Sequence, residues 1–340
     1  MTSSSPPTTS VLIATWQRPK LLERVVRSLC VQTLLPTEII VCWQNNDLET
    51  CQMLKQLQAE PLPCPLVVVH LPENGIVPAE NAALHASSGE LILLIDDDAI
   101  APVDWIHRIV RFYASHPNCG AFGGPADCWT ATGERLPINP KRPVAGLSWI
   151  GRLTTNLHDQ PPEWRALPPE KVDHLVGYNM SLRRSAFDRF EDRLKPYWQL
   201  FELDACLTAS SRGFEIWFDP GLLVEHRVGY TTGAYAPGRD GDWSIRFANS
   251  SYNQAYVLSK HSKPFWKRNF RWLYLMALGT GNTPGPMLLP ITILRNGQPL
   301  REIRLMITCL KSKHNGWRMG RNASTPDSTN RSAEHDSNRY

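Results

Sequence analysis

The 340-residue sequence lacks several patterns that would assign it quickly to a class of protein. Its eight cysteines form no C-x-x-C pair and show no histidine spacing typical of a zinc site, so we expect reduced cysteines in a cytoplasmic protein. No apolar run reaches eighteen residues, since the longest candidate, from Trp272, is interrupted by TGNTPGP; a membrane-spanning helix is not expected. The first residues, MTSSSPPTTS, lack the charged and apolar regions of a signal peptide.

Glycine-rich phosphate-binding patterns are missing as well. No predicted strand is followed by G-x-G-x-x-G, which argues against a dinucleotide-dependent oxidoreductase. A sugar-nucleotide nucleotidyltransferase would need a glycine-rich loop near the first strand, and TWQRPK at residues 15–20 has basic residues but no glycine. We keep that enzyme as an alternative.

Charge is sparse and unevenly distributed. Apolar residues make up 42% of the chain and charged residues 20%, an ordinary globular composition at a length that suits one large domain, with or without an appendage. The formal net charge is only +4, but the segment from Lys263 to Arg321 contains eleven Lys or Arg and a single acid, Glu302. We expect no nucleic-acid partner.

The first 125 residues alternate β-branched runs with longer amphipathic stretches, a pattern typical of a parallel α/β sheet covered by helices on both faces. We expect strands at 10–15, 38–43, 66–71, 91–95 and 119–125, and helices at 19–32, 48–58, 79–86 and 103–116. In such sheets, ligands bind beyond the carboxyl ends of the strands.

The rest of the chain is less regular. Residues 126–172 are rich in proline and tryptophan, and we expect an irregular lid or acceptor surface there. Further on we expect a helix at 202–212, two strands at 214–218 and 222–226 that pair with each other, and a helix at 242–261. Residues 1–9 and 321–340 are expected to be disordered.

Three adjacent aspartates, Asp96, Asp97 and Asp98, directly follow the apolar run LILLI. A lone Asp here would be explained by the next helix, whose amino terminus favours negative charge. Three neighbouring carboxylates repel one another and need a compensating group. Alternation along an extended chain points Asp96 and Asp98 the same way and Asp97 the other way. Because Mg²⁺ and Mn²⁺ take one or two carboxylates plus substrate phosphates, the sequence predicts a divalent-cation site at this D-x-D pair.

The series VLIATWQRPKLLERVVRSL, EIIV, ENAALHASSGELILLIDDD and GYNMSLRR, followed by an acidic pair, resembles the family-2 glycosyltransferases of the GT-A fold over about residues 10–226. The resemblance implies a mostly parallel, Rossmann-like sheet and the metal-assisted, inverting transfer of a sugar from a nucleotide-diphosphate donor to an acceptor hydroxyl. It implies a GT-A domain at 10–235, with a nucleotide-sugar-binding half (10–125) and an acceptor and catalytic half (126–235), and leaves a helical basic extension at 236–320.

The resemblance also suggests roles for individual residues. Asp96, Asp98 and His226 would bind Mn²⁺ or Mg²⁺, although a lone histidine is as readily structural. Glu202, with Asp204 nearby, would be the catalytic base, although acids are favoured in the first turn of a helix in any case. The donor site would contain Thr15, Arg18, Gln44, Asn46, Asn81, Asp96 and Asp97, and the acceptor side Asn179 and Met180. Arg18 could equally be a solvated surface charge, and Asn179 an ordered turn residue.

Two positions depart from the family pattern. Trp43 stands where the family usually has an acidic residue that contacts the base, and Glu80 stands where an arginine usually precedes Asn81. A catalytically silent homologue that binds nucleotide-sugars is therefore a further alternative.

The carboxyl segment interleaves basic residues (Lys267, Arg268, Arg271) with aromatic ones such as Trp266 and Phe270. This pattern resembles an interfacial anchor on anionic lipid, and the alternative is a helical cap packed on the catalytic domain. A glycan or lipid-linked acceptor of bacterial surface polysaccharide synthesis would fit a cytoplasmic enzyme that associates with the inner face of the membrane.

Overall fold

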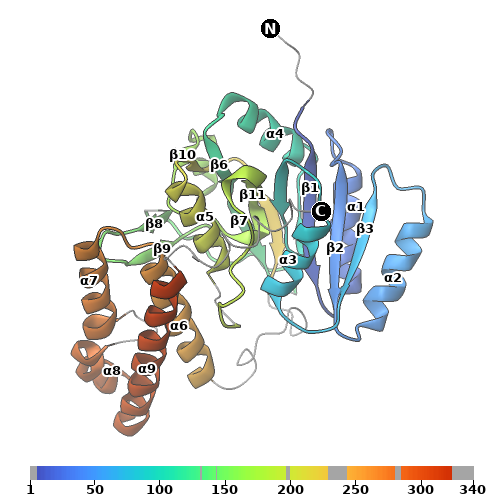
Figure 1. The fold of residues 1–340 in the computed structure, drawn as a ribbon. Helices are drawn as coiled ribbons and strands as arrows, with labels where there is room; N and C mark the ends of the chain where they lie inside the picture. The colour runs from blue at the N-terminus through green and yellow to red at the C-terminus, as the bar shows by residue number, and fades with distance from the viewer. Residues whose placement is uncertain are drawn as a thin grey trace, which may run out of the picture. The chain divides into compact units, whose positions relative to one another are not determined.

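The computed structural model describes residues 6–130, 132–142, 144–196, 200–228, 243–279 and 285–323. The chain divides into two compact units (Figure 1). The first comprises Met1–Ser148 and Arg152–Gly241, and the second comprises Trp149–Gly151 and Asp242–Tyr340.

An eight-stranded sheet forms the centre of the first unit, in the order β10-β12-β6-β11-β4-β1-β2-β3. Its strands are β1 (Thr9–Thr15), β2 (Glu38–Gln44), β3 (Leu66–Leu71), β4 (Leu91–Leu94), β6 (Cys119–Gly123), β10 (Glu170–Lys171), β11 (Met180–Arg183) and β12 (Glu215–Phe218). β1 to β4 run parallel, and β12 is parallel to β6, whereas β11 is antiparallel between β4 and β6. The sheet is mostly parallel, as the sequence predicts.

The helices of this unit are α1 (Pro19–Cys30), α2 (Leu48–Ala59), α3 (Ile76–Ala86), α4 (Trp105–Ser115) and α5 (Phe201–Ser211). They lie alongside the sheet (Figure 1). Their bounds agree with the predicted ones within a few residues. The largest difference is α3, which begins at Ile76 because Pro78 is tolerated in its first turn. All four side chains of β4 are buried, so this strand crosses the core and ends at the three aspartates.

The predicted pairing of residues 214–218 with 222–226 is wrong. β12 pairs with β6 and β10 in the large sheet, whereas β13 (Val224–Arg227) lies between β5 (Ala99–Ile100) and β7 (Ala126–Trp129) in a separate three-stranded sheet. The turn after β12 leads the chain out of the large sheet instead of folding it back. As a result, His226 lies opposite Ala99, directly after the aspartates.

The segment 126–172 is more ordered than expected. Besides β7 it contains the two-stranded sheet of β8 (Ala145–Leu147) and β9 (Leu153–Thr155), a 3-10 helix at Pro162–Ala166, and β10. These short strands carry prolines between them rather than within them, which is where proline interferes least with strand pairing.

The second unit is helical, with α6 (Trp243–Lys260), α7 (Phe265–Leu273), α8 (Leu289–Asn296) and α9 (Pro299–Ala323). α6 packs closely on α9, because Gly316 and Gly320 lie so near the backbone of Tyr252 and Tyr256 that a Cβ would come within 2.2 Å and 2.1 Å of their carbonyl oxygens. Among the described residues, no helix is long and apolar enough to cross a membrane.

The predicted bounds of the two disordered terminal segments differ slightly from the structure. β1 begins at Thr9, inside the segment expected to be disordered, and α9 continues to Ala323, three residues into the expected disordered tail. The rest of those two predictions, at residues 1–5 and 324–340, lies outside the described residues.

Candidate active site

The three aspartates at the end of β4 do not share one environment. Asp97 turns towards the loop after β1, where its carboxylate accepts hydrogen bonds from Thr15 Oγ1 (2.8 Å) and Arg18 Nη1 (2.9 Å). The same Arg18 nitrogen donates to Asp98 Oδ2 at 2.7 Å. These side chains are almost completely buried. Arg18, considered above as a donor contact or a surface charge, therefore holds two neighbouring carboxylates in place.

Asp96 and Asp98 both face His226 on the neighbouring strand β13. The His226 Nε2 atom lies 2.9 Å from Asp98 Oδ1 and 3.4 Å from Asp96 Oδ2. Ligand atoms of the three residues lie within 4.8 Å of one another, and the Asp96 side chain is 40% exposed. The structure thus brings together the three residues predicted to bind a metal. Two carboxylates and an imidazole, open to solvent on one side, are a suitable set for Mn²⁺ or Mg²⁺.

Charge compensation explains how three adjacent carboxylates coexist at this position. Burial raises the pKa of Asp97 to about 6, against the effect of Arg18. Burial would lower the pKa of Arg18, but Asp97 and Asp98 outweigh it and raise that pKa. Burial would likewise lower the pKa of His226, yet its hydrogen bonds with Asp96 and Asp98 raise that pKa well above its ordinary value. One guanidinium and one imidazolium therefore offset the repulsion.

Glu202 lies in the first turn of α5, which begins after Leu200 in the left-handed backbone region (φ 56°). Its Oε1 accepts a hydrogen bond from the Gly177 backbone at 3.3 Å. Desolvation raises the pKa of Glu202 to about 7, and the charge of Asp96 contributes to the increase. A carboxylate with a pKa near neutrality can accept a proton at physiological pH. Asp204, two residues further along α5, is only 2% exposed, whereas Glu202 is partly exposed.

Glu80 is the residue whose importance the sequence did not reveal beyond a departure from the family pattern. It lies in α3, is 6% exposed, and its Oε2 has no hydrogen-bond partner among the described residues. Burial raises its pKa to about 8, and the charges of Asp96 and Glu202 add to the shift. At pH 7 it is therefore mainly a neutral carboxylic acid, close enough to Asp96 and Glu202 to feel both charges.

Two predicted donor-site residues are engaged within the fold. Gln44 is buried and connects two loops, donating from Nε2 to Thr15 O (3.2 Å) and accepting from Gly75 N (2.7 Å). Asn81 exchanges two hydrogen bonds of 2.9 Å with the backbone of Phe190. Because these amides are already paired, both residues position the loops around the site.

The remaining donor-side positions lie at the end of β2. Asn46 is exposed, so its side chain is available to a ligand. Trp43 stacks on His70, with ring centroids 4.0 Å apart. An aromatic pair at this strand end could provide a stacking surface in place of the acidic residue that the family usually has.

Asn179 and Met180, expected on the acceptor side, are both buried in this structure. The Asn179 side chain accepts from Trp105 Nε1 (2.8 Å) and donates to the carbonyl oxygens of Pro125 (3.0 Å) and Leu222 (2.6 Å). Met180 is fully buried in β11. The Asn179 amide holds three segments together, in agreement with the alternative of an ordered structural asparagine.

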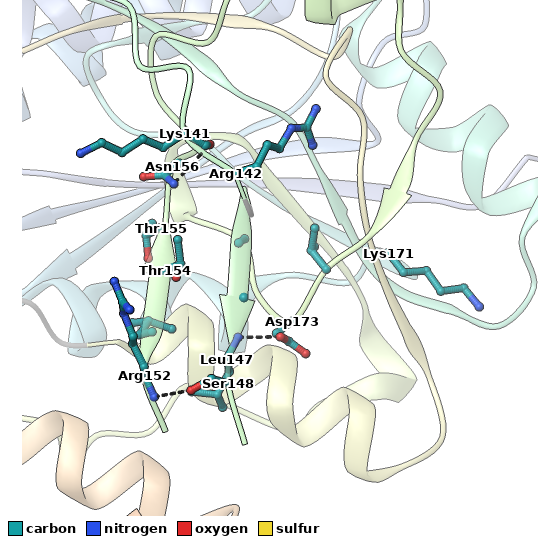
Figure 2. A pocket seen from close by; sticks show the side chains of 14 residues that line it. Lys141, Arg142, Leu147, Ser148, Arg152, Thr154, Thr155, Asn156, Lys171 and Asp173 are labelled. Carbon is teal, nitrogen blue, oxygen red and sulfur yellow. Dashed lines mark hydrogen bonds between the residues drawn. The ribbon is translucent and has the colours of Figure 1, made fainter. Parts of the chain in front are cut away.

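A cleft of about 940 Å³ is lined by residues of β8, β9 and β10 and of the segments next to them (Figure 2). Its charged lining residues are Lys141, Arg142, Arg152, Lys171 and Asp173. Asp173 accepts a hydrogen bond of 2.6 Å from Leu147 N, and four residues further along the chain Gly177 donates to Glu202. A short stretch of chain therefore connects this basic cleft to the candidate base.

Comparison with known proteins identifies the family. The model of the family described as "glycosyltransferase like family 2" matches residues 6–241, so the chain belongs to this family and is a transferase. It is 27% identical over 187 residues to the succinoglycan biosynthesis protein ExoM of Rhizobium meliloti, covering 54% of this chain and 54% of that protein. It is 29% identical over 119 residues to the glucosyl-dolichyl phosphate glucuronosyltransferase of Haloferax volcanii, covering 34% and 37%.

These matches span between about a third and about a half of the length of the curated relatives. Among solved structures, the mannosyltransferase PcManGT of Pyrobaculum calidifontis, in complex with GDP-Man and Mn²⁺, superposes with a TM-score of 0.55 at 16% identity, covering 93% of this chain and 88% of that one. This likeness confirms the expected GT-A fold.

Glu80 should make stability depend on pH. Its folded-state pKa of about 8 lies above the ordinary value of 4.5, so between these pH values the folded protein retains a proton that the unfolded chain has lost. Stability therefore falls as pH rises from about 5 to 8. In Glu80→Gln the melting temperature should fall less over this range, leaving the variant at least about 2 °C above wild type at pH 8. Thermal unfolding at both pH values measures this.

Glu49→Gln, on the exposed face of α2, is the matched control and should follow the wild-type pH dependence. Equal pH slopes for wild type and Glu80→Gln would contradict the assignment of a buried, neutral carboxyl group.

Proposed function

We propose that the protein transfers a sugar from a nucleotide-diphosphate donor to an acceptor hydroxyl with inversion at the anomeric carbon, assisted by a divalent cation. The observation that carries the proposal is the cluster of Asp96, Asp98 and His226, close enough to Glu202 for Asp96 to raise its pKa. Metal ligands and a base with a pKa near 7, at the carboxyl edge of a parallel sheet, are what this reaction requires.

Asp96, Asp98 and His226 would hold Mn²⁺ or Mg²⁺, which when bound neutralises the charge that develops on the leaving diphosphate. Glu202 accepts the proton of the acceptor hydroxyl as that oxygen attacks the anomeric carbon. The attack comes from the face opposite the diphosphate, so the configuration inverts. The Gly177 N–H holds the Glu202 carboxylate in position for this transfer.

The donor loop would be positioned by the buried contacts of Thr15 and Arg18 with Asp97. These contacts keep Asp97 away from the metal ligands and leave Asp96 exposed towards the ligand. Asn46 and Trp43 would then lie on the side of the base. The unpaired, protonated carboxyl of Glu80 would offer a hydrogen bond where the family usually has a cation.

The acceptor would be a glycan or lipid-linked glycan of surface polysaccharide synthesis. One relative acts in succinoglycan biosynthesis and another is named for a dolichyl phosphate substrate, which supports this class of acceptor. The cleft beside β8 and β9 has four basic lining residues, of which Arg142 is paired with Glu170 and Lys171 with Glu215. Its Lys141 and Arg152 would meet phosphate or carboxylate groups of the acceptor.

The second unit would associate with an anionic membrane surface on the cytoplasmic side. Its α7 exposes Phe265, Trp266 and Phe270, each at least half exposed, beside the basic Arg268. Aromatic side chains at headgroup level with neighbouring cations favour interfacial binding. Arg271 does not belong to this surface, because it is buried and donates to Trp149 O (3.1 Å) and Ser262 Oγ (3.0 Å).

Donor binding should stabilise the protein in a metal-dependent way. In a panel of nucleoside diphosphates, one nucleotide at about a hundred times its dissociation constant should add roughly 2.7 kcal/mol when Mn²⁺ is present. Asp98→Asn should lose this shift, whereas the exposed control Asp192→Asn should keep it. If no nucleotide gives a metal-dependent shift, the donor site is wrongly assigned. A shift without turnover on any acceptor would instead indicate the catalytically silent homologue.

Glu202→Gln should reduce turnover about 10²- to 10⁴-fold while donor binding is retained, because the amide cannot accept the proton. In the wild type, kcat/KM should rise with pH through about 7, since only the ionised carboxylate is active, and this rise should be absent in the variant. Steady-state kinetics at roughly pH 5.5 to 9 would measure both the loss of turnover and the midpoint of the pH dependence, the latter to about one pH unit.

Asp204→Asn is the comparison variant, since the two carboxylates are two residues apart. A loss of turnover as large as that of Glu202→Gln, in folded protein with intact donor binding, would transfer the role of base to Asp204.

Membrane association should appear as sedimentation of the intact protein with vesicles that contain phosphatidylglycerol, and it should weaken as salt is added. Arg268→Glu should reduce the bound fraction several-fold, whereas Lys55→Glu, an equal charge change on α2, should not. Absence of binding at low salt would remove the membrane surface from the proposal.

A further inference from the structure

A second group of metal-ligating side chains lies beside the carboxylate cluster and shares one residue with it. In the register of β7 and β13, Cys128 is paired directly with His226. His158 belongs to the neighbouring segment, which forms a bridge with Ala126 of β7. Three adjacent segments of backbone thus present a thiol and two imidazoles to the same place.

The distances within this group are short. Cys128 Sγ lies 3.2 Å from His158 Nδ1, and ligand atoms of Cys128, His158 and His226 all lie within 4.8 Å of one another. The Tyr178 ring covers them, with its centroid 4.7 Å from that of His158 and 5.2 Å from that of His226. Cys128 is 2% exposed, while His158 is partly exposed and leaves a route for an ion to enter.

The two ring nitrogens of His226 have different surroundings. Its Nε2 is bonded to Asp98, whereas its Nδ1 is buried and has no hydrogen-bond partner among the described residues. The Cys128 thiol lies close to His158 and also interacts with His226, so the three side chains form one cluster around this nitrogen. Metal-bound histidines typically donate their other ring N–H to a carboxylate, and His226 is arranged in that way towards Asp98.

We propose that Cys128 Sγ, His158 Nδ1 and His226 Nδ1 bind a soft divalent ion of the zinc class, with water as the fourth ligand. Thiolate and imidazole are the ligands that zinc prefers, whereas Mn²⁺ and Mg²⁺ prefer the carboxylates next to them. Binding forms zinc–sulfur and zinc–nitrogen bonds and releases to solvent the thiol proton of Cys128 and the Nδ1 proton of the His226 imidazolium, with no change in oxidation state. The proton of His226 remains on Nε2, where Asp98 accepts it.

The electrostatic environment is compatible with this site. The backbone N–H of Cys128 donates to Asp159 Oδ1 at 2.7 Å, which holds the cysteine in its strand and places a carboxylate near the bound cation. The site shares His226 with the carboxylate cluster, but its formation requires neither a nucleotide-sugar nor turnover.

Cobalt is the probe, because Co²⁺ bound to a thiolate gives a charge-transfer band in the near ultraviolet. Titration of the intact wild-type protein should give this band at one equivalent, and Zn²⁺ should abolish it. Cys128→Ser should lose the band, and His158→Asn should weaken cobalt binding at least about tenfold. One control should keep the band: Cys51→Ser, at a partly exposed cysteine of α2.

A wild-type protein without a thiolate–cobalt band would overturn the proposal, as would a band that survives in Cys128→Ser. Circular dichroism establishes that each variant is folded. If Cys128→Ser does not fold, His158→Asn decides the matter, since unchanged cobalt affinity in that variant would equally contradict the site.

Discussion

The structure around the candidate site depends on how three adjacent carboxylates are neutralised at the end of one buried strand. Arg18, from the loop after β1, bonds both Asp97 and Asp98, and His226, from β13, bonds Asp98 on its other oxygen. A buried ion pair of this kind costs much desolvation energy and leaves an uncompensated charge if one partner is lost. Because Arg18 lies in the loop after β1 and His226 lies in a strand of the three-stranded sheet, the same contacts that neutralise Asp98 also fix that loop and β13 relative to β4.

The three aspartates differ in their contacts and in their exposure to solvent. Asp97 is turned inward to Thr15 and Arg18, whereas Asp96 remains 40% exposed on the side chain. The exposed charge of Asp96 acts on its neighbours, since it contributes to the raised pKa of both Glu202 and Glu80. A cation bound at Asp96 would reverse that influence and favour the ionised form of Glu202. The candidate base would thus become a carboxylate at the moment when the donor and its cation are in place.

The sequence predicts the fold better than it predicts the site, and the reason is physical. Apolar runs and helical spacing depend on local burial, so β1 to β4 and the helices between them were predicted within a few residues. Strand pairing depends on where a turn sends the chain, and the partners of β13 could not be read from its own residues. The residues themselves indicated a cation site at Asp96 and Asp98, whereas His226 was assigned to it only through the family resemblance. The sequence could not show that Gln44, Asn81 and Asn179 form hydrogen bonds with backbone groups. The same residue types stabilise loops and bind ligands, so the sequence does not distinguish the two roles.

The two nitrogens of His226 face groups of different chemical hardness, and this gives the residue a role that neither group has alone. Nε2 faces carboxylates that suit Mn²⁺ or Mg²⁺. Nδ1 is buried without a hydrogen-bond partner among the described residues, and His226 also belongs to the cluster with Cys128 and His158. A hard ion that uses Nε2 must displace its proton, because a protonated nitrogen has no lone pair to donate. A soft ion on Nδ1 instead leaves the proton on Nε2, held by Asp98. Which of its two ring protons the His226 imidazolium loses would therefore decide which of the two neighbouring metal sites can use this residue.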